Sequence, residues 1–158
     1  MLLIAGAVLL LLGTLSHEAA AQTKRILLVG DSWAQQTWDN NAWPPVLSTY
    51  GLSQWGVEGS TTAIGGTTAA VWTDPAALAL IANAIAANPT IDIIHLSIGG
   101  NDMLAGQSLG GWHTGLSPAQ ESALFDQIQA NIEIIVDYCL AIRPDIKVGL
   151  IDYDYINL

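Results

Sequence analysis

The chain has 158 residues, enough for one domain with a hydrophobic core of its own. Only 11% of the residues are charged, and 14 acidic against 4 basic side chains give a net charge of −10. This balance argues against a nucleic-acid-binding protein, which needs a basic face to neutralise phosphates. A single cysteine, Cys139, excludes an internal disulfide framework and a zinc site built from cysteines.

An unbroken apolar run occupies residues 2–15. It is shorter than the roughly 20 residues with which a helix spans a bilayer, and three alanines at 19–21 follow it as a small-residue cleavage pattern. We therefore expect residues 1–21 to be a secretory signal peptide, the protein to be secreted or periplasmic, and no stable membrane span to remain after cleavage. An uncleaved membrane anchor is the alternative, because no lysine or arginine stands between Met1 and the apolar run.

Apolar strands and helices alternate along the mature chain. A helix in two pieces, or a helix followed by a loop, is expected over 33–50, because Pro44-Pro45 interrupts it. The next helix begins after Asp74 at Pro75, and a third begins with a capping box at Ser117. The strands are expected where short apolar runs indicate burial in a parallel sheet, at 26–29, 57–64, 91–98 and 146–151. The alternation predicts an α/β fold in which helices connect parallel strands.

Each of the first three expected strands ends in glycine followed by small polar residues: Gly30-Asp31-Ser32, Gly65-Gly66-Thr67 and Gly99-Gly100-Asn101-Asp102. In an open α/β sheet, ligands bind outside the carboxyl ends of the strands, so we expect these segments to share one edge. A serine hydroxyl can act as a nucleophile, and glycine N–H groups and an asparagine amide can bind an oxyanion. The three segments therefore predict an acyl-transfer site, while ordinary turn chemistry is the alternative for Gly-Asp-Ser.

The letters, order and strand-end placement of these segments resemble the SGNH (GDSL-type) hydrolase family over about residues 24–151. The resemblance implies a flavodoxin-like three-layer α/β/α sandwich with a parallel sheet. It also implies a serine ester hydrolase of the esterase, lipase or acetylesterase type. Its partner would be a small-molecule or polysaccharide ester, and the sequence does not indicate which one.

The resemblance also implies roles for individual residues. Ser32 matches the nucleophile, and the Ser32 N–H, the Gly66 N–H and the Asn101 side chain match the oxyanion hole. Gly59, in Gly59-Ser60-Thr61, is the alternative for the glycine, because both segments fit the Gly-x-Thr pattern of the family. The acidic neighbours are expected to brace the loops by hydrogen bonds; these are Asp31 and Asp102.

No metal and no cofactor is expected. The acids that follow the last strand, Asp152 and Asp154, lack the further ligands that a metal site needs. The sequence contains no Gly-x-x-x-x-Gly-Lys motif, and its few basic residues disfavour a phosphate ligand.

The general base of the family is a histidine in an Asp-x-x-His segment near the C-terminus, and the chain ends before such a segment. The Asp-x-x-His from Asp92 to His95 lies inside an expected strand, where residues three apart point to opposite faces. We interpret His95 as a histidine satisfied within the sheet. We interpret His113, in the loop after Asn101, as an ordinary loop residue, and a substitute base is the alternative.

We therefore expect residues 22–158 to be an incomplete SGNH-like domain of a longer hydrolase, with little or no activity by itself. A non-catalytic module that binds glycan or acyl ligands is the first alternative. A flavodoxin-like flavin or nucleotide binder is the second, although the charge of Asp31 disfavours a phosphate in the first loop.

Overall fold

The computed structural model describes residues 22–105 and 110–151, so the expected signal peptide and the acids after the last strand lie outside the described residues. None of the described helices combines the length and apolarity that crossing a membrane requires. In chain order, the elements are β1 (Thr23–Gly30), α1 (Ser32–Asp39), α2 (Trp43–Thr49), β2 (Trp55–Glu58), α3 (Ala69–Trp72), α4 (Pro75–Ala87), β3 (Ile93–Ser97), α5 (Gly100–Leu104), α6 (Pro118–Ile142) and β4 (Lys147–Leu150).

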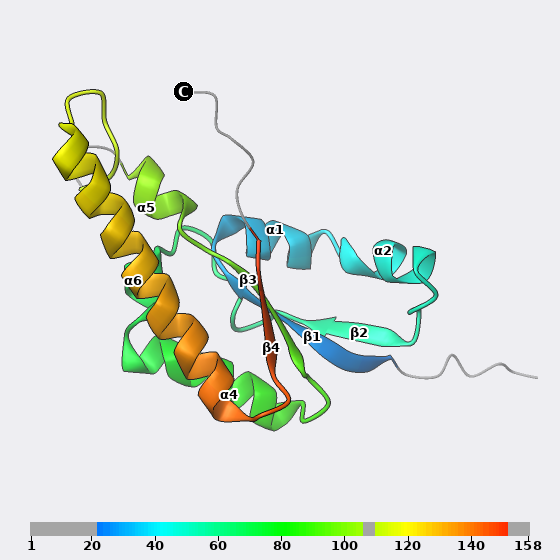
Figure 1. Ribbon diagram of the computed structural model, residues 1–158. Coiled ribbons are helices and arrows are strands. Elements are labelled where there is room, and N and C mark those ends of the chain that lie inside the picture. The colour runs from blue at the N-terminus through cyan, green and yellow to red at the C-terminus, as the bar shows by residue number, and fades with distance from the viewer. Residues whose placement is uncertain (1–21, 106–109, 152–158) are drawn as a thin grey trace, which may run out of the picture.

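The described strands form one parallel sheet in the order β2-β1-β3-β4 (Figure 1). This is the order of flavodoxin-like sheets, in which the connections reverse direction between β1 and β3. The pairing of β1 with β3 runs from Ile26 opposite Ile93 to Gly30 opposite Ser97. The α/β fold with a parallel sheet that the sequence predicts is confirmed.

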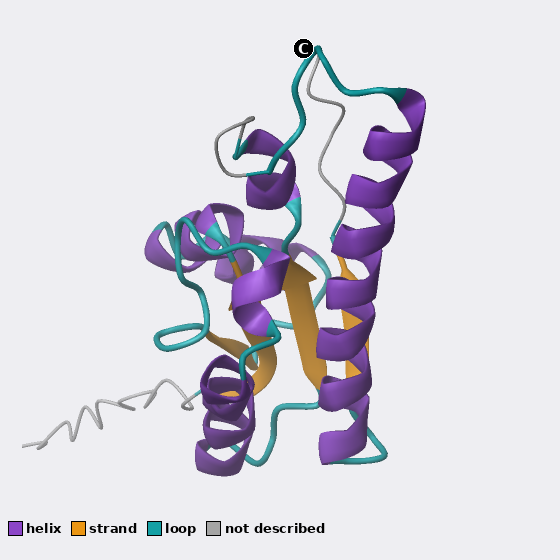
Figure 2. Ribbon diagram, turned by 90° about the vertical axis from the view of Figure 1, so that its left-hand side faces the viewer, coloured by secondary structure: helices purple, strands orange, loops and turns teal. Residues whose placement is uncertain are grey.

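Helices cover both faces of the sheet (Figure 2). Leu27 and Val29 of β1 are fully buried in the core that α3, α4 and α6 form with one face. Ile26 and Leu28 are buried on the other face, in the core formed with α1 and α2. Because alternate residues of a strand point to opposite faces, a strand covered on both faces is apolar throughout.

Capping residues fix the starts of the main helices. The Asp74 carboxylate accepts a hydrogen bond from the Ala76 N–H at 2.7 Å and begins α4. Ser117 and Gln120 form the expected capping box at the start of α6. At the other end, α6 stops before Arg143, which precedes a proline and adopts the extended backbone that proline favours.

Three elements differ from the expectation. The strand expected over 57–64 is β2, which ends at Glu58. The Glu58 carboxylate accepts hydrogen bonds from the N–H groups of Gly59 (3.1 Å) and Ser60 (2.9 Å), and these bonds turn the chain out of the sheet. The short helices α3 and α5 also occupy segments for which the sequence predicted no helix.

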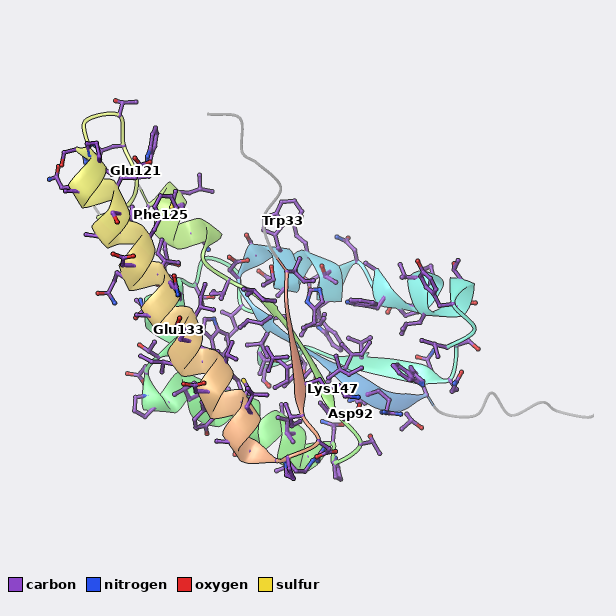
Figure 3. All side chains as sticks on the ribbon, viewed as in Figure 1. Trp33, Asp92, Glu121, Phe125, Glu133 and Lys147 are labelled. Atoms are coloured by element: carbon purple, nitrogen blue, oxygen red, sulfur yellow. The ribbon has the colours of Figure 1, made fainter. Side chains whose placement is uncertain are left out.

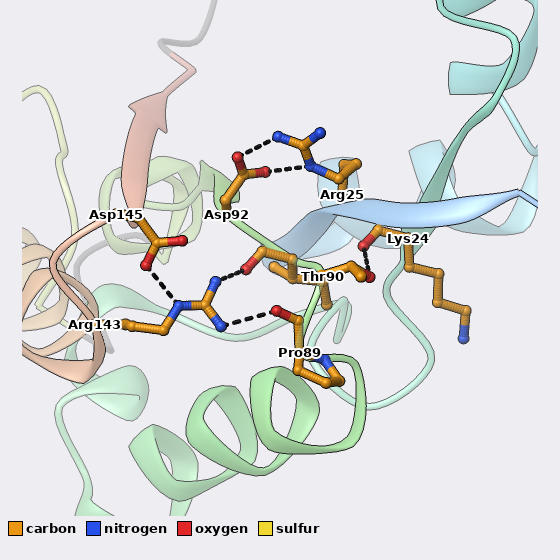
Figure 4. A network of polar contacts seen from close by, with 8 residues as sticks. Lys24, Arg25, Pro89, Thr90, Asp92, Arg143 and Asp145 are labelled. Carbon is orange, nitrogen blue, oxygen red and sulfur yellow. Dashed lines mark hydrogen bonds and ion pairs between the residues drawn. The ribbon is translucent and has the colours of Figure 1, made fainter.

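A polar network lies at the amino-terminal end of the sheet, opposite the glycine-rich strand ends (Figure 4). Arg25 on β1 makes two hydrogen bonds to the carboxylate of Asp92, one of them 2.8 Å long. Arg143 pairs with Asp145 and donates to the backbone carbonyl of Pro89 at 3.0 Å. Asp92 is therefore a structural anchor far from the carboxyl edge, and Figure 3 shows it at the opposite end of the sheet from Trp33, the residue after Ser32.

Candidate active site at the carboxyl edge of the sheet

The end of β1 and the start of α1 place Ser32. Gly30 has a φ of 136°, and a Cβ atom there would overlap with the carbonyl oxygen of Ser97, so only glycine fits. The Asp31 N–H donates to the same carbonyl at 3.0 Å, and the buried Asp31 side chain accepts from the Trp33 N–H at 3.0 Å. Ser32 is consequently the first residue of α1, half-buried at the carboxyl edge.

The segment after β2 is tied to the end of β1. The Gly30 N–H donates to the carbonyl of Thr62 at 3.0 Å, and the Ile64 N–H donates to the carbonyl of Gly30 at 2.8 Å. This pairing brings the next residue, Gly65, beside the nucleophile candidate. A Cβ atom at Gly65 would lie 3.8 Å from the Cα atom of Ser32.

The segment after β3 is tied to the segment after β2. The Asn101 side-chain nitrogen donates to the carbonyl of Thr67 at 2.8 Å. The Asp102 carboxylate accepts from the N–H of Ala69 at 2.8 Å, and the Trp72 indole donates to the Thr67 hydroxyl at 2.9 Å. The three strand-end segments that the sequence singled out therefore meet at one edge of the sheet.

The two glycines that the sequence predicts for the oxyanion hole, Gly66 and Gly59, and the neighbouring Gly65 have different surroundings. Gly65 lies next to Ser32, and its N–H donates to the side-chain oxygen of Gln35 at 3.0 Å. Gly66 has a φ of 78° and open space where a Cβ atom would be. The Gly59 N–H donates to Glu58, and its Cα faces the Trp38 ring closely enough that a Cβ atom would lie 3.1 Å from it.

The two described histidines, His95 and His113, make no hydrogen bond to Ser32 among the contacts of the described residues. His95 lies in β3, and its ring meets the ring of Trp43 edge-on, with 5.3 Å between the centroids. Burial lowers the pKa of His95. His113 accepts a hydrogen bond at Nδ1 from the Gly115 N–H at 3.2 Å, within its own loop.

The interpretation of His95 as a satisfied histidine is wrong. Its Nδ1 atom and the Trp43 indole nitrogen are both buried without a hydrogen-bond partner among the described residues. Both rings line a cavity of about 220 Å³ together with Thr37, Ala42 and Val46. The cavity lies against α1, α2 and β3 and does not include Ser32.

Within the described residues, no group of three or more histidine, cysteine or acidic side chains is arranged to hold a metal ion. The polar groups at the carboxyl edge include the Ser32 hydroxyl, the Asn101 amide and the backbone N–H groups of the strand-end segments. These are groups that can attack a carbonyl carbon and bind its oxygen.

No protein-family model and no curated protein matches this chain. Solved structures do match. An acetyl xylan esterase has 20% sequence identity and a TM-score of 0.51, and the match covers 80% of this chain and 56% of that one. A gut microbial diltiazem-metabolizing enzyme has 12% identity and a TM-score of 0.51, with 82% of this chain and 27% of that one covered. At these identities the likeness shows a shared α/β fold, and the present chain spans only part of each neighbour.

Proposed function

We propose that the protein is a serine ester hydrolase of the SGNH type, exported by a signal peptide at residues 1–21. The observation that carries the proposal is that Gly65 lies beside Ser32 and that Asn101 is bonded to Thr67, in the segment that contains Gly65. These residues follow three separate strands of one parallel sheet, at its carboxyl edge. The shared fold with an acetyl xylan esterase supports the proposal, because that fold accommodates ester hydrolysis.

In the proposed reaction, the Ser32 oxygen attacks the carbonyl carbon of the ester, and its proton passes to a general base. The oxyanion of the tetrahedral intermediate accepts hydrogen bonds from the Ser32 N–H, the Asn101 amide and a glycine N–H. We assign that N–H to Gly65 rather than Gly66, because the Gly65 backbone lies beside Ser32. Collapse of the intermediate releases the alcohol, and water then hydrolyses the acyl–serine bond.

The acidic neighbours of these residues hold the loops in the proposal. Asp31 caps α1 and so fixes the Ser32 N–H at the helix start. Asp102 holds the start of α3 through the Ala69 N–H, and this contact keeps the segment after β2 against α5.

Neither His95 nor His113 makes a hydrogen bond to Ser32 among the described residues, so the proposal assigns the general base to neither of them. The family resemblance assigns it to a C-terminal Asp-x-x-His segment, and the 158-residue sequence has no such segment after Asp92–His95. Because no histidine is bonded to Ser32 among the described residues, we expect slow acylation of Ser32 in the absence of an added general base, and we expect such a base to accelerate the reaction.

Imidazole in solution can stand in for the absent base, and this gives a direct test. Hydrolysis of p-nitrophenyl acetate is measured at rising imidazole concentrations for the wild-type protein and for Ser32→Ala, which reports the background reaction. The proposal predicts that the difference between the two rates grows with imidazole. Ser53→Ala, at an exposed serine after α2, is the matched control and should behave as the wild type.

Equal rates for the wild type and Ser32→Ala at every imidazole concentration would contradict a serine hydrolase. That result would favour the alternative of a non-catalytic module that binds glycan or acyl ligands at the same edge.

A further inference from the structure

Gln35 lies one turn after Ser32 on α1, so the two side chains share a face of the helix. Its amide oxygen accepts a hydrogen bond from the Gly65 N–H at 3.0 Å. A Cβ atom at Gly65 would overlap with this oxygen and would lie 3.8 Å from the Ser32 Cα atom. Gly65 thus allows the Gln35 oxygen to approach the backbone directly next to Ser32.

An amide carbonyl oxygen is the same kind of acceptor as the carbonyl oxygen of an ester. The Gly65 N–H has one hydrogen and bonds strongly to one acceptor at a time, so Gln35 and an oxyanion compete for it. We propose that the Gln35 side chain occupies the Gly65 N–H in the resting protein as a stand-in for the substrate oxygen, and that it must turn away before the oxyanion binds. This inference rests on the proposed function, in which the Gly65 N–H belongs to the oxyanion hole.

Gln35 is exposed, so its side chain has solvent into which it can turn. The contact is one hydrogen bond between neutral groups, and such bonds contribute a net stabilisation that corresponds to a factor of about 2 to 10 in an equilibrium constant. Removal of the acceptor should therefore raise the rate of Ser32 acylation by about 2- to 10-fold. If Gln35 only oriented the Gly65 N–H, removal of its side chain would instead lower the rate of Ser32 acylation, because the N–H would be misplaced.

Three substitutions separate these roles. Gln35→Ala removes the side-chain amide, and Gln35→Met keeps much of its volume without an oxygen. Gln35→Glu replaces the neutral acceptor with a carboxylate, whose charge-assisted hydrogen bond to the N–H is stronger. Gln36→Ala, at the next exposed position of α1, is the matched control.

The readout is phosphonylation of Ser32 by a fluorophosphonate in the presence of imidazole. The serine oxygen bonds to phosphorus, fluoride leaves with the electrons of the P–F bond, and imidazole takes the proton. The phosphoryl oxygen then occupies the oxyanion hole.

We expect faster labelling of Gln35→Ala and Gln35→Met, slower labelling of Gln35→Glu at neutral pH, and no change for Gln36→Ala. The Gly65 amide should also exchange its hydrogen faster in Gln35→Ala, measured by NMR.

Unchanged or slower labelling of both Gln35→Ala and Gln35→Met, with labelling still dependent on Ser32, would overturn this inference and leave the proposed function standing. Absence of Ser32-dependent labelling in every variant would overturn the proposed function and this inference together.

Discussion

The side-chain nitrogen of Asn101 donates a hydrogen bond to the backbone carbonyl of Thr67 at 2.8 Å. This bond joins the segment after β3 to the segment after β2, two parts of the chain that are 34 residues apart. A primary amide carries two hydrogens, so the second one can bind a ligand oxygen while the first holds the loop. The Asn101 side chain can in this way hold the two segments together and also donate a hydrogen bond to a bound ligand.

Replacement of Asn101 by alanine is expected to affect stability and chemistry differently. Loss of one oxyanion donor should lower imidazole-assisted acylation of Ser32 by ~100-fold or more. Loss of the bond to Thr67 should lower the free energy of unfolding by only about 1 kcal/mol. Phosphonylation rates and urea denaturation measure the two effects.

Asn88→Ala is the control for Asn101→Ala. The Asn88 side chain makes a similar bond, to the carbonyl of Ala84 at 3.0 Å, at the end of α4. It should lose comparable stability and keep the wild-type labelling rate. Equal labelling rates for the two variants would remove Asn101 from the proposed oxyanion hole.

Gly30 should tolerate alanine far less well than Gly51, although both have a positive φ. At Gly51 nothing lies within 4 Å of the position of a Cβ atom, so alanine adds only backbone strain of about 1–2 kcal/mol. At Gly30 the Cβ atom would also overlap with the Ser97 carbonyl, and overpacking of this kind costs a further 1–3 kcal/mol or so. Midpoints of urea unfolding compare the two variants, and equal midpoints would be inconsistent with the described end of β1.

Glu58 should make stability depend on pH in the acid range. Burial raises the pKa of Glu58, but hydrogen bonds from Lys24 and Ser60 outweigh this effect and hold the pKa at about 2, against an ordinary 4.5. Because the folded-state pKa is the lower one, the stabilisation is complete above pH 4.5 and is lost as the pH falls towards 2. Lys24 is partly exposed, so solvent screening limits the contribution to about 1–2 kcal/mol.

Glu58→Gln tests this contribution by urea denaturation between pH 2 and pH 6 or so. The variant should be less stable than the wild type at the upper end of that range, and the difference should shrink in acid. Glu133→Gln, at an exposed position in the middle of α6, is the control and should show no such convergence. A constant difference between Glu58→Gln and the wild type across the range would show that the Glu58 charge does not stabilise the fold.

Cys139 should report whether α6 is packed on the sheet. Its side chain is fully buried, and burial raises the pKa of the thiol to about 12. A thiol reagent at mildly alkaline pH should therefore leave the native protein unmodified and react once urea unfolds it. Because the chain contains one cysteine, the signal has a single source. Rapid modification of the native protein would contradict the described packing of α6.

Features that depend on nearby residues could be predicted from the sequence. The apolar runs at 26–29 and 91–98 predict β1 and β3, and the capping residues Asp74 and Ser117 predict the starts of α4 and α6. The end of β2 at Glu58 was not predicted, because the apolar and threonine-rich run continues past it and the pairing of Thr62 and Ile64 with Gly30, more than 30 residues away, depends on the fold.

In the candidate site, too, the features that depend on distant residues could not be predicted from the sequence. The sequence identified Ser32 and Asn101 by their motifs, and the structure brings their segments together. The sequence favoured Gly66, with Gly59 as the alternative, and did not propose Gly65, because the position of Gly65 beside Ser32 and its bond to Gln35 depend on the fold. Export of the protein and the roles of these residues stay predictions.

The role of Ser32 as the nucleophile is tested most directly by locating a fluorophosphonate adduct with peptide mass spectrometry. The sample is folded protein, in which Cys139 does not react with a thiol reagent. We predict an adduct on Ser32 that accumulates faster with imidazole and is missing in Ser32→Ala. A folded protein that carries no adduct on Ser32 at any imidazole concentration would contradict this prediction.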